Sequence, residues 1–165
     1  MQIHLSLHRS GNVLVYGIPV WYRIVSGATA LALVVAAAFS GGLGIAGNVI
    51  VVIAALAALY QERWTFDPGS DSCTGRIGLV FAAKGPTYKA SDVARLRLDI
   101  FAKGRLDQKD LPPEDKMPFG SQARLIVETK DGEAFMLDSV PFKRRAELEA
   151  SALAIADAIG VTLES

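Results

Sequence analysis

Two apolar stretches decide the architecture of this chain: residues 24–39, IVSGATALALVVAAAF, and residues 43–60, LGIAGNVIVVIAALAALY. At 1.5 Å per residue, about 20 helical residues cross a hydrocarbon core about 30 Å thick. Both stretches are apolar around the whole helix and not along one stripe, as expected for a helix surrounded by lipid. Because only Ser40, Gly41 and Gly42 connect them, they predict an antiparallel transmembrane hairpin.

Charge divides the chain in the same place. Up to residue 60 the only basic residues are Arg9 and Arg23, and acidic residues are absent. The other 15 basic and all 17 acidic residues follow, so the remainder is mildly acidic. Nucleic acid as a partner would call for a basic excess. We therefore expect three parts, namely an N-terminal strand segment (1–17), a transmembrane hairpin (18–61) and a domain outside the membrane (62–165), with no nucleic-acid partner.

Aromatic and basic residues flank the hairpin on the side where charge appears. This arrangement is typical of a membrane interface, and arginines on one side predict a cytoplasmic location for that side. We expect a multi-pass membrane protein with both termini in the cytoplasm. The interface residues predicted in this way are Trp21, Tyr22, Arg23, Tyr60, Arg63 and Trp64.

Small residues predict where the two helices pack, because helices in lipid associate through close contact of smooth surfaces. The predicted seam consists of Ala28, Ala32, Ala36, Gly44, Asn48, Ala54 and Ala58. Asn48 has two readings: its side chain forms a hydrogen bond across the seam, or it lies near the headgroups.

The pattern Gly42-x-Gly44-x-x-Gly47, with Asp67 further on, matches a dinucleotide-binding fingerprint. That fingerprint needs a preceding strand and an amphipathic helix, whereas residues 48–60 have no polar face. We assign these glycines to the hairpin turn and its packing. No cofactor is expected.

The remaining elements read as short strands and one helix. Alternating polarity before a Ser10-Gly11-Asn12 turn predicts an N-terminal β-hairpin at the membrane surface, able to join the sheet of the following domain. The further predicted strands are residues 63–67, 76–83, 87–90, 93–101, 122–129 and 134–140, the last two joined through Asp131-Gly132, a dipeptide favoured in type I′ turns. A helix over residues 142–159 has Leu148, Ala152, Ile155 and Ile159 on one face and ends at Gly160. These elements predict an α+β fold.

The sequence contains few residues in patterns that would suit catalysis, metal binding or anion binding. Cys73 is the only cysteine, and His4 and His8 lie about 13 Å apart on a strand, so neither a catalytic triad nor a zinc cluster is indicated. Asp107, Asp110, Glu114 and Asp115 lie in a long loop, but their spacing fits no calcium site. The basic run Lys143-Arg144-Arg145 opens the last helix against its macrodipole, which leaves two readings: a solvated helix end, or a contact with an anion or lipid headgroup.

A two-span hairpin followed by residues 62–67, ERWTFD, meandering strands, an Asp-Gly hairpin and a basic-started terminal helix resembles bacterial membrane proteins with a pleckstrin-homology-like domain. The resemblance covers nearly the whole chain and implies a curved antiparallel sheet capped by the final helix. It also implies a binding or scaffolding role and not catalysis.

Three functions follow as hypotheses. The first is a non-catalytic accessory or scaffold protein of the bacterial inner (cytoplasmic) membrane, whose cytoplasmic β-rich domain binds a protein partner or lipid headgroups. The second is a structural subunit of a larger membrane complex, with the hairpin as its main contact surface. The third, an enzyme, would need a deep polar pocket in the β-rich domain.

Overall fold

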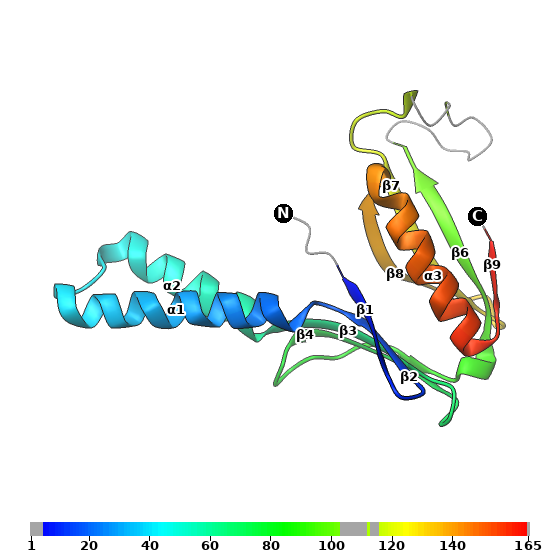
Figure 1. Cartoon of the computed structure of the whole chain (residues 1–165), viewed down its shortest axis with the longest axis horizontal. Helices are drawn as coiled ribbons and strands as arrows, with labels where there is room; N and C mark the ends of the chain where they lie inside the picture. Colours follow the sequence, from blue (N-terminus) through cyan, green and yellow to red (C-terminus); the bar gives the residue numbers. More distant parts are fainter. Residues whose placement is uncertain (1–4, 103–111, 113–115, 165) are drawn as a thin grey trace.

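The computed structural model describes residues 5–102, 112 and 116–164 (Figure 1). His4 and the loop acids Asp107, Asp110, Glu114 and Asp115 lie outside these residues, and so do the predictions made for them. The fold is a mixture of helix and antiparallel sheet with a helix near the C-terminus. Along the chain the elements are β1 (Ser6–Ser10), β2 (Val13–Gly17), α1 (Val20–Ser40), α2 (Gly44–Leu59), β3 (Tyr60–Asp67), β4 (Ser72–Leu79), β5 (Thr87–Tyr88), η1 (Ala90–Asp92), β6 (Val93–Phe101), β7 (Gln122–Thr129), β8 (Ala134–Pro141), η4 (Phe142–Arg144), α3 (Arg145–Ile159) and β9 (Thr162–Glu164).

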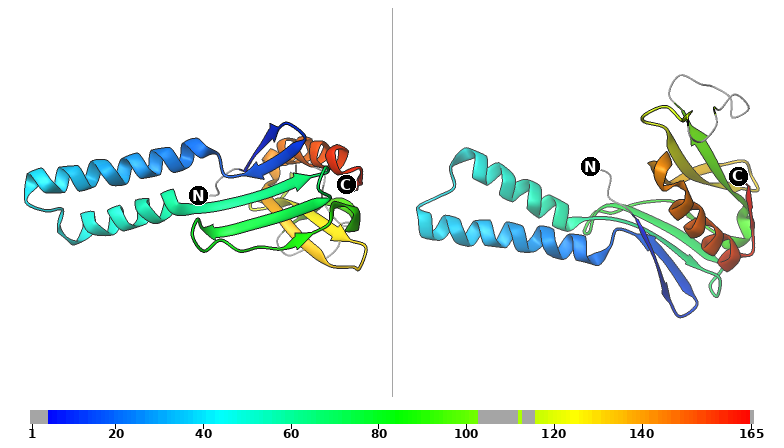
Figure 2. Two further views of the ribbon diagram at one scale, coloured as in Figure 1. Left: turned by 90° about the horizontal axis from the view of Figure 1, so that it is seen from below. Right: turned by 45° about the horizontal axis from the view of Figure 1, so that its top comes forward.

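Helices α1 and α2 run side by side in opposite directions and project away from the β-rich part of the molecule (Figures 1 and 2). The turn between them uses left-handed backbone at Gly41, Gly42 and Gly44, where φ is +72°, +123° and +64°. Side chains other than glycine rarely adopt this conformation. The glycine fingerprint therefore makes a helix–helix turn, as its assignment to the hairpin predicted.

Helix α2 is shorter than the apolar stretch from which it was predicted. It has 16 residues and gives way to β3 at Tyr60 without a connecting loop. Tyr60 pairs with Leu79 across β3 and β4, and the amide of Val80 donates to the carbonyl of Leu59 at 2.9 Å. These sheet contacts end the helix before its apolar sequence ends.

One sheet has five antiparallel strands in the order β1-β2-β3-β4-β5. Strand β2 precedes the helical pair and β3 follows it, yet the two strands are neighbours, with Leu14 opposite Phe66 and Gly17 opposite Arg63. The predicted N-terminal hairpin is therefore part of the same sheet as the chain after the helices. Strand β4 begins four residues before its predicted start, because the tight turn after Asp67 lets pairing resume at Ser72.

The second sheet has the order β8-β7-β6-β9. Its antiparallel strands β6, β7 and β8 match the predicted ranges to within one residue. Strand β9 was not predicted; it has three residues and pairs in parallel with β6. The turn between β7 and β8 is not type I′, because Gly132 has a positive φ of +87° but Asp131 does not.

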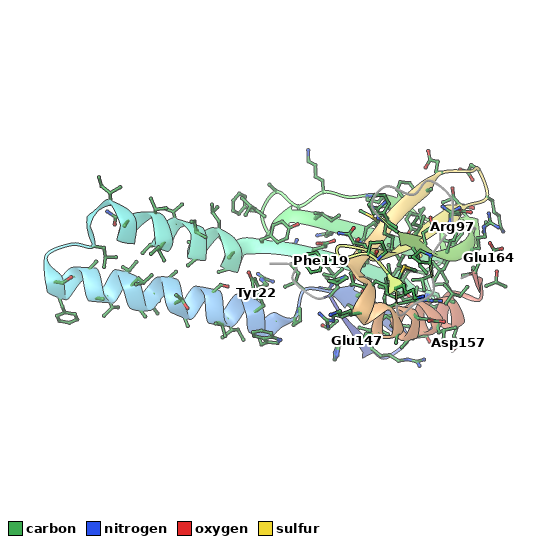
Figure 3. All side chains as sticks on the ribbon, turned by 90° about the horizontal axis from the view of Figure 1, so that it is seen from above. Tyr22, Arg97, Phe119, Glu147, Asp157 and Glu164 are labelled. Atoms are coloured by element: carbon green, nitrogen blue, oxygen red, sulfur yellow. The ribbon has the colours of Figure 1, made fainter. Side chains whose placement is uncertain are left out.

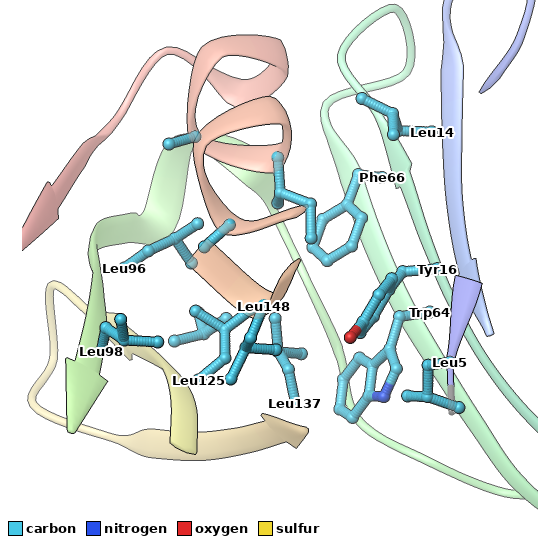
Figure 4. Close-up of a cluster of buried hydrophobic side chains, with 14 of the residues drawn as sticks. Leu5, Leu14, Tyr16, Trp64, Phe66, Leu96, Leu98, Leu125, Leu137 and Leu148 are labelled. Atoms are coloured by element: carbon cyan, nitrogen blue, oxygen red, sulfur yellow. The ribbon is translucent and has the colours of Figure 1, made fainter. Parts of the chain in front are cut away.

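Helix α3 lies between the two sheets and closes the core (Figures 1 and 4). Its one-turn start η4 and its end at Gly160, with φ +72°, agree with the predicted helix. Figure 4 shows side chains of the first sheet facing those of the second sheet and α3. The largest fully buried side chains are Tyr16, Phe66, Leu96, Leu98, Leu125, Leu137, Leu148, Ile155, Val127 and Cys73.

A hydrogen bond joins the two sheets inside this core. The hydroxyl of Tyr16 on β2 donates to the Asp138 carboxylate on β8. Burial, followed by the Asp138 charge, raises the pKa of Tyr16 far above its usual value, so the hydroxyl keeps its proton. Burial also raises the pKa of Glu62, and the charge of Asp138 adds to that shift. Glu62 comes two residues before the buried Trp64 on β3, so it lies on the same inner side of the sheet.

Replacing Tyr16 with phenylalanine is expected to destabilise the β-rich part by about 1.5–3 kcal/mol, the range for a hydrogen bond to a charged group. Tyr88 provides the matched control, because its hydroxyl is buried without a hydrogen-bond partner and its ring stacks on Phe135. Tyr88→Phe is expected to be neutral or stabilising. Hydrogen exchange of the second sheet in the purified chain measures both changes, and equal effects would contradict the assignment.

Candidate functional site

The surface of the helical pair is the most unusual feature of the molecule. Neither α1 nor α2 contains a buried residue, although both consist almost wholly of apolar side chains. Figure 3 shows these carbon side chains projecting around both helices, whereas oxygen and nitrogen atoms gather in the β-rich part. Among the described residues, one helix, Val20–Ser40, is long and apolar enough to cross a membrane, and Gly44–Leu59 is apolar but shorter.

The seam between the helices differs from the prediction on α1. Ala28, Ala32 and Ala36 are exposed and point away from α2. The half-buried residues of α1 are Tyr22, Arg23, Ser26, Gly27, Ala30, Leu33 and Ala37. The alanine pattern has the correct period of about four, but periodicity alone cannot say which of several small-residue stripes faces the neighbour.

On α2 the prediction is wrong for Gly44 and Asn48, which are exposed, whereas Ala54 and Ala58 are half-buried. A Cβ atom placed on Gly27 would lie 3.7 Å from the Cβ of Ala58, so the two helices are in contact there. Because Asn48 is exposed near the tip, its position disagrees with a hydrogen bond across the seam.

Arg23 joins the two helices at the end of the pair that is nearest the β-rich part, which we call the base. Its Nε donates a hydrogen bond of 3.1 Å to the carbonyl of Ala58, in the last turn of α2. Carbonyls in that turn have no helical partner, and a cation there interacts favourably with the macrodipole, by about 0.3–1 kcal/mol. One arginine thus ties the start of α1 to the end of α2.

Aromatic residues gather at this base. Trp21 is exposed, and its ring lies edge-on to that of Tyr22 at 6.2 Å. Tyr22 and Tyr60 line a shallow apolar recess of about 340 Å³ together with Leu56, Ala57 and Leu79. Three of the predicted interface aromatics are therefore located where the helices leave the β-rich part.

Trp64 is the exception, and its assignment to the interface is wrong. It is 2% exposed and belongs to the core, because β3 turns Trp64 and Phe66 to the same inner face. Its ring covers Gly75 on β4, where an added Cβ would lie 2.7 Å from a ring carbon. Arg63, one residue earlier, faces outward and is exposed.

Sequence reasoning missed one element at the base. The end of β4 lies beside the end of α2, through the bond from the Val80 amide to Leu59. The following turn exposes Val80 and Phe81, which are 44% and 75% accessible. The apolar pair Val80-Phe81 lies inside the predicted strand 76–83, but β4 ends at Leu79, so the pair belongs to the turn.

The basic run at the start of α3 does not form one free cationic group. Arg144 donates to Glu147 at 2.6 Å, and Arg145 lies 3.8 Å from Glu149. Lys143 is exposed. Two of the three cations thus have carboxylate neighbours, which weakens the case for an anion or lipid contact at this run.

Groups suited to catalysis are not assembled in the described part of the chain. Cys73 is buried in the core, and burial raises the pKa of its thiol to about 12, so almost no thiolate forms at neutral pH. Within the described ranges, no group of three His, Cys, Asp or Glu side chains is placed to hold a metal ion.

Comparison with known proteins adds no assignment: no family model matches the chain, and no curated protein is similar to it.

Proposed function

We propose that this chain is a non-catalytic accessory or scaffold protein of a bacterial inner membrane. Its α1–α2 hairpin spans the bilayer, and its β-rich part, a pleckstrin-homology-like module, binds a protein partner or lipid headgroups on the cytoplasmic side. Burial of the single thiol among core side chains supports a binding role over nucleophilic catalysis.

The pairing of β2 with β3 carries the membrane proposal. These strands lie on either side of the helical pair in sequence and are hydrogen-bonded neighbours in one sheet. If α1 alone crossed a bilayer, β2 and β3 would be on opposite sides and could not pair. An apolar α1 that enters lipid therefore requires α2 to bring the chain back, so both termini lie on one side.

The dimensions of the helices support this arrangement. The 21 residues of α1 give about 31 Å and the 16 of α2 about 24 Å, against a core about 30 Å thick. A hydrophobic segment a few ångströms short is accommodated by local thinning of the bilayer or by flanking side chains, at a modest cost. Arg23 and Arg63 lie at the base, and the described tip has no charged residue, which favours a cytoplasmic base.

One observation favours the second function, a structural subunit of a larger membrane complex. The Ala28, Ala32 and Ala36 stripe faces outward, and such a smooth stripe is suited to packing against a helix of another protein. In mild detergent a subunit would co-purify with its partner in fixed stoichiometry. A scaffold would run alone or as a small homo-oligomer.

Cysteine labelling in intact cells tests the membrane proposal, because the buried Cys73 gives little background. Ser40→Cys places an exposed thiol at the hairpin tip, and Asp131→Cys places one in the turn between β7 and β8. A maleimide that cannot cross the inner membrane is expected to label position 40 in cells with a permeabilised outer membrane. Position 131 is expected to react only after the inner membrane is broken.

Equal labelling of both positions before lysis would contradict the proposal, and so would release of the wild-type chain from membranes by alkaline carbonate. The wild-type chain serves as the control for Cys73, since any label it takes up measures opening of the core.

A further inference from the structure

A groove of about 490 Å³ lies between the outer face of the β1–β2–β3 part of the first sheet and the start of α1. Its walls include Ser6, His8 and Gly17 from the strands and Val20 and Arg23 from α1. Because Val20 and Arg23 belong to the first turns of the proposed membrane span, the groove opens where lipid headgroups would begin.

Arginine side chains supply the positive charge of this region. Arg63 lines the groove, and Arg76 lies directly opposite Arg63 across β3 and β4, on the same outer face. Like charges at such positions, with Cβ atoms about 4.5–5.5 Å apart, repel and destabilise a sheet. Neither guanidinium has a hydrogen bond or ion pair with another described residue.

The second sheet shows that this pattern is unusual for the molecule. On its outer face Arg95 lies 2.6 Å from Glu128 and 2.8 Å from Glu164, and Arg97 lies 3.0 Å from both Glu128 and Asp99. Arginines there are neutralised by carboxylates, whereas Arg63 and Arg76 face each other.

Glu62 is the acidic residue that borders the groove, and it does not neutralise the arginines. Along β3, Glu62 shares the inner face with Trp64 and Phe66, and its pKa shift comes from burial and from Asp138 on that side. Its carbonyl accepts the amide of Ile18 and so belongs to the wall of the groove. Gly17 lies opposite Arg63, and a Cβ atom there would be 2.6 Å from the carbonyl oxygen of Glu62, so β2 and β3 approach closely at this wall of the groove.

We infer that this groove binds the phosphate of an anionic phospholipid, with Arg63, Arg76 and Arg23 as the cationic contacts. The inference rests on the proposed membrane function and names its ligand class. The planar, forked guanidinium of arginine can donate two hydrogen bonds at once to the oxygens of a phosphate. Arg63 is three residues after the first residue of β3, about 10 Å along the strand. The charge of lipid headgroups still acts over that distance, because the Debye length is about 8–10 Å.

Native mass spectrometry of the full chain, in micelles with equal amounts of phosphatidylglycerol and phosphatidylcholine, tests the inference. The wild-type chain is expected to retain phosphatidylglycerol preferentially. Arg63→Gln and Arg76→Gln should each lower this preference about fivefold, the factor for about 1 kcal/mol per basic residue at an anionic surface, and the double variant roughly twenty-fivefold. Lys130→Gln removes the same charge from the turn between β7 and β8, away from the helices (Figure 2), and should change nothing.

A double variant that keeps the wild-type preference would overturn the groove assignment. Displacement of the lipid by inorganic phosphate would overturn the choice of a lipid and indicate a soluble phosphate compound. The glutamine variants should fold at least as well as wild type, since they relieve repulsion. Should they unfold, the Arg63→Lys and Arg76→Lys pair, which keeps the charge but not the fork, is expected to show an intermediate loss.

Carbonate extraction of the same variants separates the two proposals. If the wild-type chain is released, the membrane function fails. If every variant stays with the membrane and the preference is unchanged, only the groove assignment fails.

Discussion

Leu31→Arg is expected to abolish stable membrane integration of the chain. Leu31 lies near the middle of α1 and is 65% exposed. At the centre of a membrane helix, leucine contributes about −0.3 to −0.6 kcal/mol to insertion and arginine costs about 2.5–3.5 kcal/mol. The change of about 3–4 kcal/mol shifts the insertion equilibrium by several hundredfold. Alkaline carbonate should then release the variant, and protease should digest it.

Leu153→Arg is the matched control. Leu153 on α3 is 55% exposed, close to the value for Leu31, but α3 belongs to the part of the molecule that we place in water. An exposed substitution there usually changes stability by less than about 0.5 kcal/mol. If α1 were also surrounded by water, the two variants would behave alike, and that result would remove the membrane proposal.

Trp64→Ala is expected to destabilise the β-rich part by about 3–5 kcal/mol, the range for removing a buried aromatic side chain. Its ring is buried between the first sheet and the rest of the core and covers the glycine at position 75. A loss of this size is a large fraction of the stability of an ordinary domain. Hydrogen exchange of β6 and β7 should therefore become faster by about two to three and a half orders of magnitude where it proceeds by global opening.

Trp21→Ala separates this effect from the general loss of an aromatic residue. Trp21 is 64% exposed at the base of the hairpin and has no part in the core. The variant should leave exchange of β6 and β7 unchanged. Equal acceleration in both variants would show that Trp64 does not have the structural role that its burial indicates.

The sequence was most informative where a pattern had one physical solution. Strict alternation located β6 to β8 because only one face of each strand can be buried. Gly160 marked the end of α3 because a left-handed residue is needed there. The two uniformly apolar stretches also predicted two adjacent helices, because a helix without a polar face does not fit at the surface of a soluble core.

Prediction failed where several arrangements satisfy the same pattern. Ala28, Ala32 and Ala36 form one of several small-residue stripes on α1, and the contacts of Arg23 and Gly27 with Ala58 select another. Trp64 was placed at the interface because it follows an apolar stretch, but β3 begins at Tyr60, and the pleat then turns Trp64 inward. The paired arginines at positions 63 and 76 depend on strand register, which sequence spacing does not give.

The neighbouring positions of β2 and β3 have a consequence for biosynthesis. A ribosome delivers β1 and β2 before either helix, and β3 only after both. In the proposed membrane arrangement, the edge of β2 has no partner until the whole hairpin has entered the bilayer, and such an unpaired edge invites aggregation. On that proposal, pairing of β2 with β3 can be completed only after both helices have been inserted, so a chain stalled with one helix inserted would keep the edge of β2 unpaired.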